Sequence, residues 1–72
     1  DERKLDNIEF SDRELELLNY IAAGLTNKAI SIKIGVSENT VKYHLKNILR
    51  KLNVQNRAEA VAYAVQAGLI SA

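Results

Sequence analysis

Residues 26–52 read TNKAISIKIGVSENTVKYHLKNILRKL, and this stretch decides the fold. Thr26 and Ser37 are residue types that cap helix N-termini, so they predict the starts of two helices, one ending at Ile34 and one covering residues 38–52. Gly35 lies between them and can adopt the positive φ that closes the first helix at little steric cost. The pattern therefore predicts two helices joined by a tight turn.

The helix predicted over residues 38–52 has two different faces. At 100° per residue, one set of apolar side chains falls within roughly 100°, the width of a stripe that packs on a core. This set is Val41, Leu45, Ile48, Leu49 and Leu52. A second arc, centred about 120° away, has no acid. It holds Asn39, Lys42, Tyr43, Lys46 and Arg50. We expect the aromatic ring on this arc to contact another molecule; the alternative is a solvated face with an incidental tyrosine.

The segment before Thr26 predicts another helix. Ser11 and Glu14 have the spacing of a capping box, so we expect a helix from there to about Ala23, ended by Gly24. The side chains that we expect to face inward are Leu15, Leu18, Ile21 and Ala22.

The last helix is expected over about residues 57–67, opened by a second capping box at Asn56 and Glu59. It is apolar nearly all round, and a small domain cannot cover such a helix completely, so we expect a dimer interface on it. The expected interface residues are Val61, Ala62, Ala64 and Val65. The alternative is that alanines are simply good helix formers that tolerate water.

Four helices with short connections predict an all-α domain over residues 10–72. Residues 1–9 are charged and aperiodic, and we interpret them as a linker. Because the chain begins without a methionine, we expect it to be a piece of a longer protein.

Composition argues against an enzyme. There is no cysteine, which excludes a thiolate metal site and is compatible with a cytoplasmic location. The single histidine, His44, has no partner group in view, so we expect no catalytic residue, metal, cofactor or small-molecule ligand. No apolar run approaches the roughly 18 residues of a membrane span.

The net charge of +1 conceals an asymmetry. Residues 1–16 hold seven acids and three bases, whereas residues 17–72 hold seven bases and two acids. Those seven bases lie between Lys28 and Arg57, a concentration that attracts phosphates.

DNA binding accounts for these residue types. Lysine donates to guanine and asparagine pairs with adenine in the major groove, and apolar groups contact the thymine methyl. The expected base-edge residues are Asn39, Lys42, Tyr43 and Lys46. The expected phosphate contacts are Asn27, Lys28, Lys33, Ser37, Thr40, Arg50, Lys51 and Arg57.

Four segments together resemble the helix-turn-helix domain of the LuxR/FixJ/NarL type, found in bacterial transcription regulators. They are residues 10–18 (FSDRELELL), 24–28 (GLTNK), 34–45 (IGVSENTVKYHL) and 54–61 (VQNRAEAV). The resemblance implies a four-helix domain whose third helix recognises DNA and whose fourth forms a dimer. It places Lys42, Tyr43 and Lys46 at base edges, Thr40 at a phosphate and Val41 in the core.

Two positions depart from the family pattern. Ala29 stands where family members usually carry glutamate, so the capping box of its helix lacks one half. Ser31 stands where an alanine normally packs, and we expect its hydroxyl to bond to the carbonyl four residues earlier.

The resemblance implies the C-terminal output domain of a two-component or quorum-type regulator, which binds double-stranded DNA as a homodimer and can contact RNA polymerase. Two alternatives stay open at this point. One is a helical protein-interaction module with a basic face, and the other is the promoter-reading domain of a sigma factor.

Overall fold

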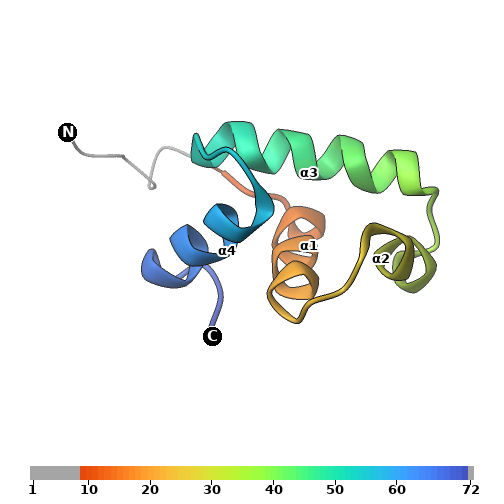
Figure 1. Ribbon diagram of the computed structural model, residues 1–72, viewed down its shortest axis with the longest axis horizontal. Coiled ribbons are helices and arrows are strands. Elements are labelled where there is room, and N and C mark those ends of the chain that lie inside the picture. Colours follow the sequence, from red (N-terminus) through yellow and green to blue (C-terminus); the bar gives the residue numbers. More distant parts are fainter. Residues whose placement is uncertain (1–8, 72) are drawn as a thin grey trace.

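The computed structural model describes residues 9–71 and folds them into four helices (Figure 1). They are α1 (Asp12–Ala22), α2 (Asn27–Ile34), α3 (Glu38–Leu52) and α4 (Arg57–Gln66). The all-α prediction is confirmed, and α3 has the predicted bounds. Residues 1–8 of the predicted linker lie outside the described residues. No helix within residues 9–71 is long and apolar enough to cross a bilayer.

Each helix begins at a side-chain cap that the local sequence supplies. The hydroxyls of Ser11, Thr26 and Ser37 accept from the backbone N–H three residues later, each at 3.1 Å. The capping box of α1 is complete, because Glu14 Oε1 accepts from the Ser11 N–H at 2.9 Å.

The capping box predicted for α4 is only half present. Asn56 Oδ1 accepts from the Glu59 N–H at 2.9 Å, as expected. The Glu59 carboxylate, however, accepts from the Gln55 N–H at 2.7 Å, one residue before the cap. The backbone is strongly extended at Asn56 (φ −153°, ψ 172°), and the carboxylate pairs with the preceding amide.

The turn between α2 and α3 depends on Gly35. Its φ of 73° and ψ of 36° are left-handed, and the N–H groups of Gly35 and Val36 both donate to the Ser31 carbonyl, at 2.9 and 3.0 Å. Ser31 itself is buried. Its hydroxyl donates to the Lys28 carbonyl at 2.7 Å, so the bond reaches back three residues rather than the expected four.

A single apolar core joins all four helices and the C-terminal segment. Its buried members are Leu17, Leu18, Ile21, Ile30, Val41, Ile48, Leu52, Ala60, Ala64 and Ile70. The prediction of which α1 side chains face the core was partly wrong. Leu17 is fully buried, whereas Leu15 is half-buried and Ala22 is exposed. The core lies against the side of α1 that carries residues 14, 17, 18 and 21, as 3.6-residue spacing requires.

The helices lie so that α3 forms one long side of the molecule. It packs against α1, α2 and α4, and α1 also packs against α4. In Figure 1, α3 runs along one edge with the other three helices on its opposite side. One stripe of α3, consisting of Val41, Ile48 and Leu52, is therefore buried, and we call it the inner stripe.

Shortening a side chain of the inner stripe should lower the stability of the fold strongly. Ile48 is fully buried, so Ile48→Ala should lower the free energy of unfolding by roughly 2–5 kcal/mol, as measured by urea denaturation. Ile32→Ala is the matched control, because Ile32 is 72% exposed on α2 and the same change there should cost about 0.5 kcal/mol or less. Equal losses in the two variants would contradict this core.

Candidate nucleic-acid interface

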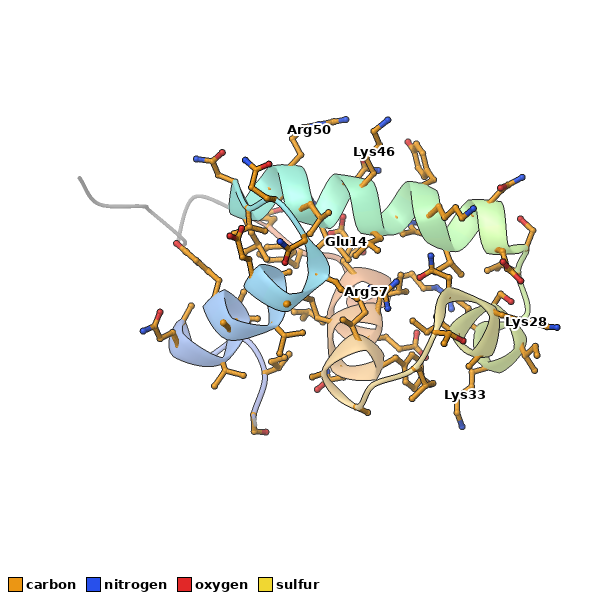
Figure 2. The ribbon with its side chains drawn as sticks, in the orientation of Figure 1. Glu14, Lys28, Lys33, Lys46, Arg50 and Arg57 are labelled. Carbon is orange, nitrogen blue, oxygen red and sulfur yellow. The ribbon has the colours of Figure 1, made fainter. Side chains whose placement is uncertain are left out.

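The side of α3 opposite the inner stripe is uncovered. Its residues are all exposed, and we call them the outer face of α3: Asn39, Lys42, Tyr43, Lys46 and Arg50. Figure 2 shows Lys46 and Arg50 pointing away from the other three helices. The structure thus brings together all four residues predicted to meet base edges, with Arg50 beside them.

The dimensions of α3 suit a DNA groove. A helix of 15 residues is roughly 22 Å long, and the major groove is wide enough, at about 12 Å, to admit one. The outer face carries three positive charges and no acid, so it can approach phosphates without a repulsive partner. This geometry is what a recognition helix needs.

Tyr43 is exposed and contacts one neighbouring ring. Its side chain is 63% exposed, yet its ring contacts that of half-buried His44, with centroids 5.8 Å apart and planes at 64°. This is the edge-on arrangement that aromatic pairs prefer. His44 itself is half-buried, between the buried and the exposed sides of α3.

The N-termini of α2 and α3 supply groups suited to phosphate oxygens. The hydroxyls of Ser37 and Thr40 lie 3.0 Å apart at the start of α3, beside amides that have no partner within the helix. Lys28 is exposed in the first turn of α2. These three expected phosphate contacts therefore lie near the ends of helices whose dipoles favour an anion.

Lys33 does not join this group. It points to the side of the molecule opposite Lys46 and Arg50 (Figure 2). A straight duplex lying on the outer face of α3 is out of its reach, so the prediction that Lys33 contacts phosphate has no support in this arrangement. The sequence could not place it, because α2 has only eight residues and no clear separation of apolar and polar sides.

Arg57 and Asn27, two further expected phosphate contacts, bind each other. The Arg57 guanidinium donates to the Leu25 carbonyl at 3.1 Å and also to Asn27 Oδ1. These bonds tie the start of α4 to the loop before α2. Because a guanidinium has five N–H donors, Arg57 keeps donors for a phosphate while holding the two elements together.

Lys51 has a structural role that was not predicted. Its ammonium donates to Glu14 Oε1 at 2.8 Å and to the Glu9 carbonyl at 2.7 Å, and it lies 5.3 Å from the centre of the Phe10 ring. Lys51 thus links the end of α3 to the start of α1. The expected contact of Lys51 with a phosphate stays a prediction, since its side chain is 37% exposed and its ammonium has a third donor.

Glu14 is the buried half of this pair, with only 7% of its surface exposed. Burial alone would raise the pKa of its carboxyl group. The hydrogen bonds from Lys51 and from the Ser11 backbone, together with the Lys51 charge, outweigh burial and hold that pKa below its usual value. The ionised form of Glu14 therefore stabilises the fold.

Comparison with known proteins places this geometry in a family. Residues 9–64 match the model of the luxR family of bacterial regulatory proteins. The transcriptional activator protein PhzR of Pseudomonas fluorescens is 45% identical over 64 residues, which cover 89% of this chain and 26% of PhzR.

Two solved structures have the same fold. The response regulator ChrA of a heme-sensing two-component system superposes with a TM-score of 0.84 at 40% identity, over 97% of this chain and 33% of that one. The transcription factor GerE gives a TM-score of 0.82 at 32% identity, over 96% of this chain and 97% of GerE. This chain thus spans about a third or less of PhzR and ChrA and nearly all of GerE.

The Glu14–Lys51 pair predicts a pH-dependent stability. Because the folded-state pKa of Glu14 is lowered, its contribution is fully present above the unfolded-state pKa of about 4.3 and is lost as the pH falls through the folded value. Glu14→Gln keeps the cap but removes the charge. The difference in free energy of unfolding between wild type and this variant should be largest near neutral pH and shrink in acid.

Urea denaturation at a series of pH values measures this difference. Glu16→Gln is the control, because the Glu16 ion pair with Arg13 is exposed and long, at 3.5 Å, and should contribute about 0.5 kcal/mol or less. A wild-type advantage over Glu14→Gln that stays constant from neutral pH to acid would contradict the assignment.

Proposed function

Because the chain belongs to the LuxR family of bacterial regulatory proteins, with the family's helix-turn-helix fold, we propose that it binds double-stranded DNA in a sequence-specific manner with α3 in the major groove. One observation carries the proposal: the longest helix leaves a basic, acid-free face uncovered on one side of the molecule. This domain acts as the output domain of a transcription regulator.

The outer face of α3 supplies the groups that base readout requires. Lys42 and Lys46 are one helical turn apart and donate to guanine O6 and N7, while Asn39 pairs with adenine. Tyr43 adds an apolar ring between the charged groups. Each of these side chains is exposed, so groove binding requires no rearrangement of the core.

Phosphate contacts fix α3 in the groove. In this proposal Lys28 and the start of α2 meet one strand, Ser37 and Thr40 meet it at the start of α3, and Arg50 reaches the other strand. Asn27 and Arg57 contribute as a bonded pair at the same end of α2. Such contacts position the domain and give its affinity a salt dependence.

A dimer forms through α4 in this proposal, with one correction to the expected interface. Ala64 is fully buried in the domain and has no surface to offer a second copy. The surface that remains consists of exposed Ala62 and half-buried Val61 and Val65. Two copies would place their α3 helices in successive major grooves about 34 Å apart, on a site with two-fold or pseudo-two-fold symmetry.

The rest of the regulator follows from the family. We infer an upstream regulatory domain that controls access to α3 or α4, a location in the cytoplasm, and contacts with RNA polymerase at the promoter. PhzR is an activator and ChrA a response regulator, both several times longer than the matched segment.

Selection of bound sequences from a random duplex library tests the proposal. The 72-residue chain should recover a repeat with half-sites about one helical turn apart. Recovery of no motif, with binding that disappears as salt rises, would instead mean that the basic face provides only nonspecific attraction. The protein-interaction module would then be the better function.

The two groove lysines should carry sequence discrimination. Lys42→Ala and Lys46→Ala should each weaken binding to the selected duplex by roughly 1–3 kcal/mol and weaken binding to random DNA less, in fluorescence anisotropy titrations. Lys33→Ala is the matched control, because it removes the same charge from the far side of the molecule. Equal losses on both duplexes, or an equal loss in Lys33→Ala, would show that charge alone is responsible.

If α4 forms the dimer interface, a charge placed on its exposed side should prevent self-association. Val65 lies at the edge of the exposed stripe of α4, so Val65→Glu should abolish self-association on the selected duplex and leave the helix content unchanged. Ile32→Glu is the control, since it places the same charge on an exposed apolar residue of α2. Sedimentation of the protein–DNA complexes reports the number of copies bound. The same stoichiometry for wild type and Val65→Glu would exclude Val65 from the interface.

A further inference from the structure

Two large apolar side chains are strongly exposed among residues 9–71, Ile32 and Tyr43. Ile32 lies on α2, and single exposed residues of this kind are common on protein surfaces. Tyr43 differs because it lies among the cations of the outer face of α3. Its ring therefore lies on the surface that the proposed function assigns to DNA.

Tyr43 points almost directly away from the core. It follows fully buried Val41 by two residues, which turns its direction by roughly 160° around the helix axis. When a helix lies in a groove with its buried side toward the protein, the side chain opposite that buried side meets the groove floor. Tyr43 occupies this position on α3.

The ring of Tyr43 has a neighbour within the domain, the ring of His44. Residues adjacent in a helix do not normally face each other, so the contact with His44 depends on a particular rotamer of each side chain. The 5.8 Å centroid distance and 64° interplanar angle lie within the preferred edge-on range. A contact of this kind with half-buried His44 favours one orientation of the Tyr43 ring, and an oriented ring loses less entropy on binding.

We propose that Tyr43 reads the C5 methyl group of a pyrimidine in the major groove, and that His44 is the positioning residue that holds its ring for this contact. The inference rests on the proposed function and names the base feature that this domain selects. Thymine carries the methyl group in ordinary DNA, and 5-methylcytosine carries the same group in methylated DNA.

The chemistry of the groove favours the methyl group over other partners. The base edges in the major groove present acceptors, amino donors and one apolar group, the thymine methyl. Lys42 and Lys46 already offer donors to the acceptors on either side. The Tyr43 side chain is 63% exposed and its ring is the apolar surface of the outer face, so the methyl group is the base-edge feature that complements it.

The test replaces each thymine of the selected duplex, one at a time, by uracil, which removes only the methyl group. Wild type should bind about three- to fivefold more weakly at one position in each half-site, the effect of burying one methyl group. Tyr43→Ala should lose this discrimination, and Tyr43→Phe should retain it. Replacing that thymine–adenine pair by cytosine–guanine should weaken binding, and 5-methylcytosine should recover part of the loss.

The positioning role of His44 is tested separately, by the ratio of binding to the thymine and uracil duplexes. His44→Ala should reduce the thymine-to-uracil ratio toward that of Tyr43→Ala, and His44→Phe should restore it because an aromatic ring again contacts Tyr43. Circular dichroism on each variant checks that the helices are intact. A ratio unchanged in His44→Ala would overturn the positioning role.

The outcomes separate this inference from the proposed function. If a motif is recovered but uracil has no effect at any position in wild type, or has the same effect in Tyr43→Ala, then Tyr43 does not read the methyl group and sequence-specific binding still stands. If no motif is recovered, both the proposed function and the role of Tyr43 are overturned.

Discussion

The packing of one side of α3 against the rest of the domain is the interaction on which everything else depends. Val41, Ile48 and Leu52 are buried against the other helices, and all three are among the largest fully buried side chains. Because the core of so small a domain has few members, these three residues both stabilise the fold and fix the rotation of α3 about its axis. That rotation decides that Lys42, Tyr43 and Lys46 face outward. Stability and presentation of the outer face are therefore consequences of the same stripe.

The positively charged residues of the domain differ in what they contact. Lys51 donates hydrogen bonds to Glu14 and to the Glu9 carbonyl, and these bonds link the end of α3 to the start of α1. Arg57 is bonded to the loop before α2. The outer-face cations Lys42, Lys46 and Arg50 are exposed, and they can neutralise phosphates without first breaking a buried pair. Basic residues close together in the sequence thus serve the scaffold, the proposed interface or, in the case of Arg57, both.

Features set by local sequence could be predicted, whereas those set by distant partners could not. The bounds of α3 and the left-handed Gly35 follow from caps and turn chemistry within a few residues, and the structure confirms them. The Lys51–Glu14 pair joins residues 37 positions apart, and no local pattern signals it. Helix α4 shows the same limit: alanines line it on most sides, so periodicity could not reveal that Ala60 and Ala64 face the core. The helical period did group the outer face of α3 correctly, because a long amphipathic helix defines its own two sides.

The central claim is that the outer face of α3 enters the major groove, and dimethyl sulfate interference on the selected duplex tests it most directly. The reagent methylates guanine N7 in the major groove and adenine N3 in the minor groove, so one experiment reports on both. We expect premethylated guanines to block binding in two clusters about one helical turn apart, and methylated adenines within those clusters to have no effect. Interference from adenine N3 alone, or from neither position, would contradict the placement of α3 in the major groove.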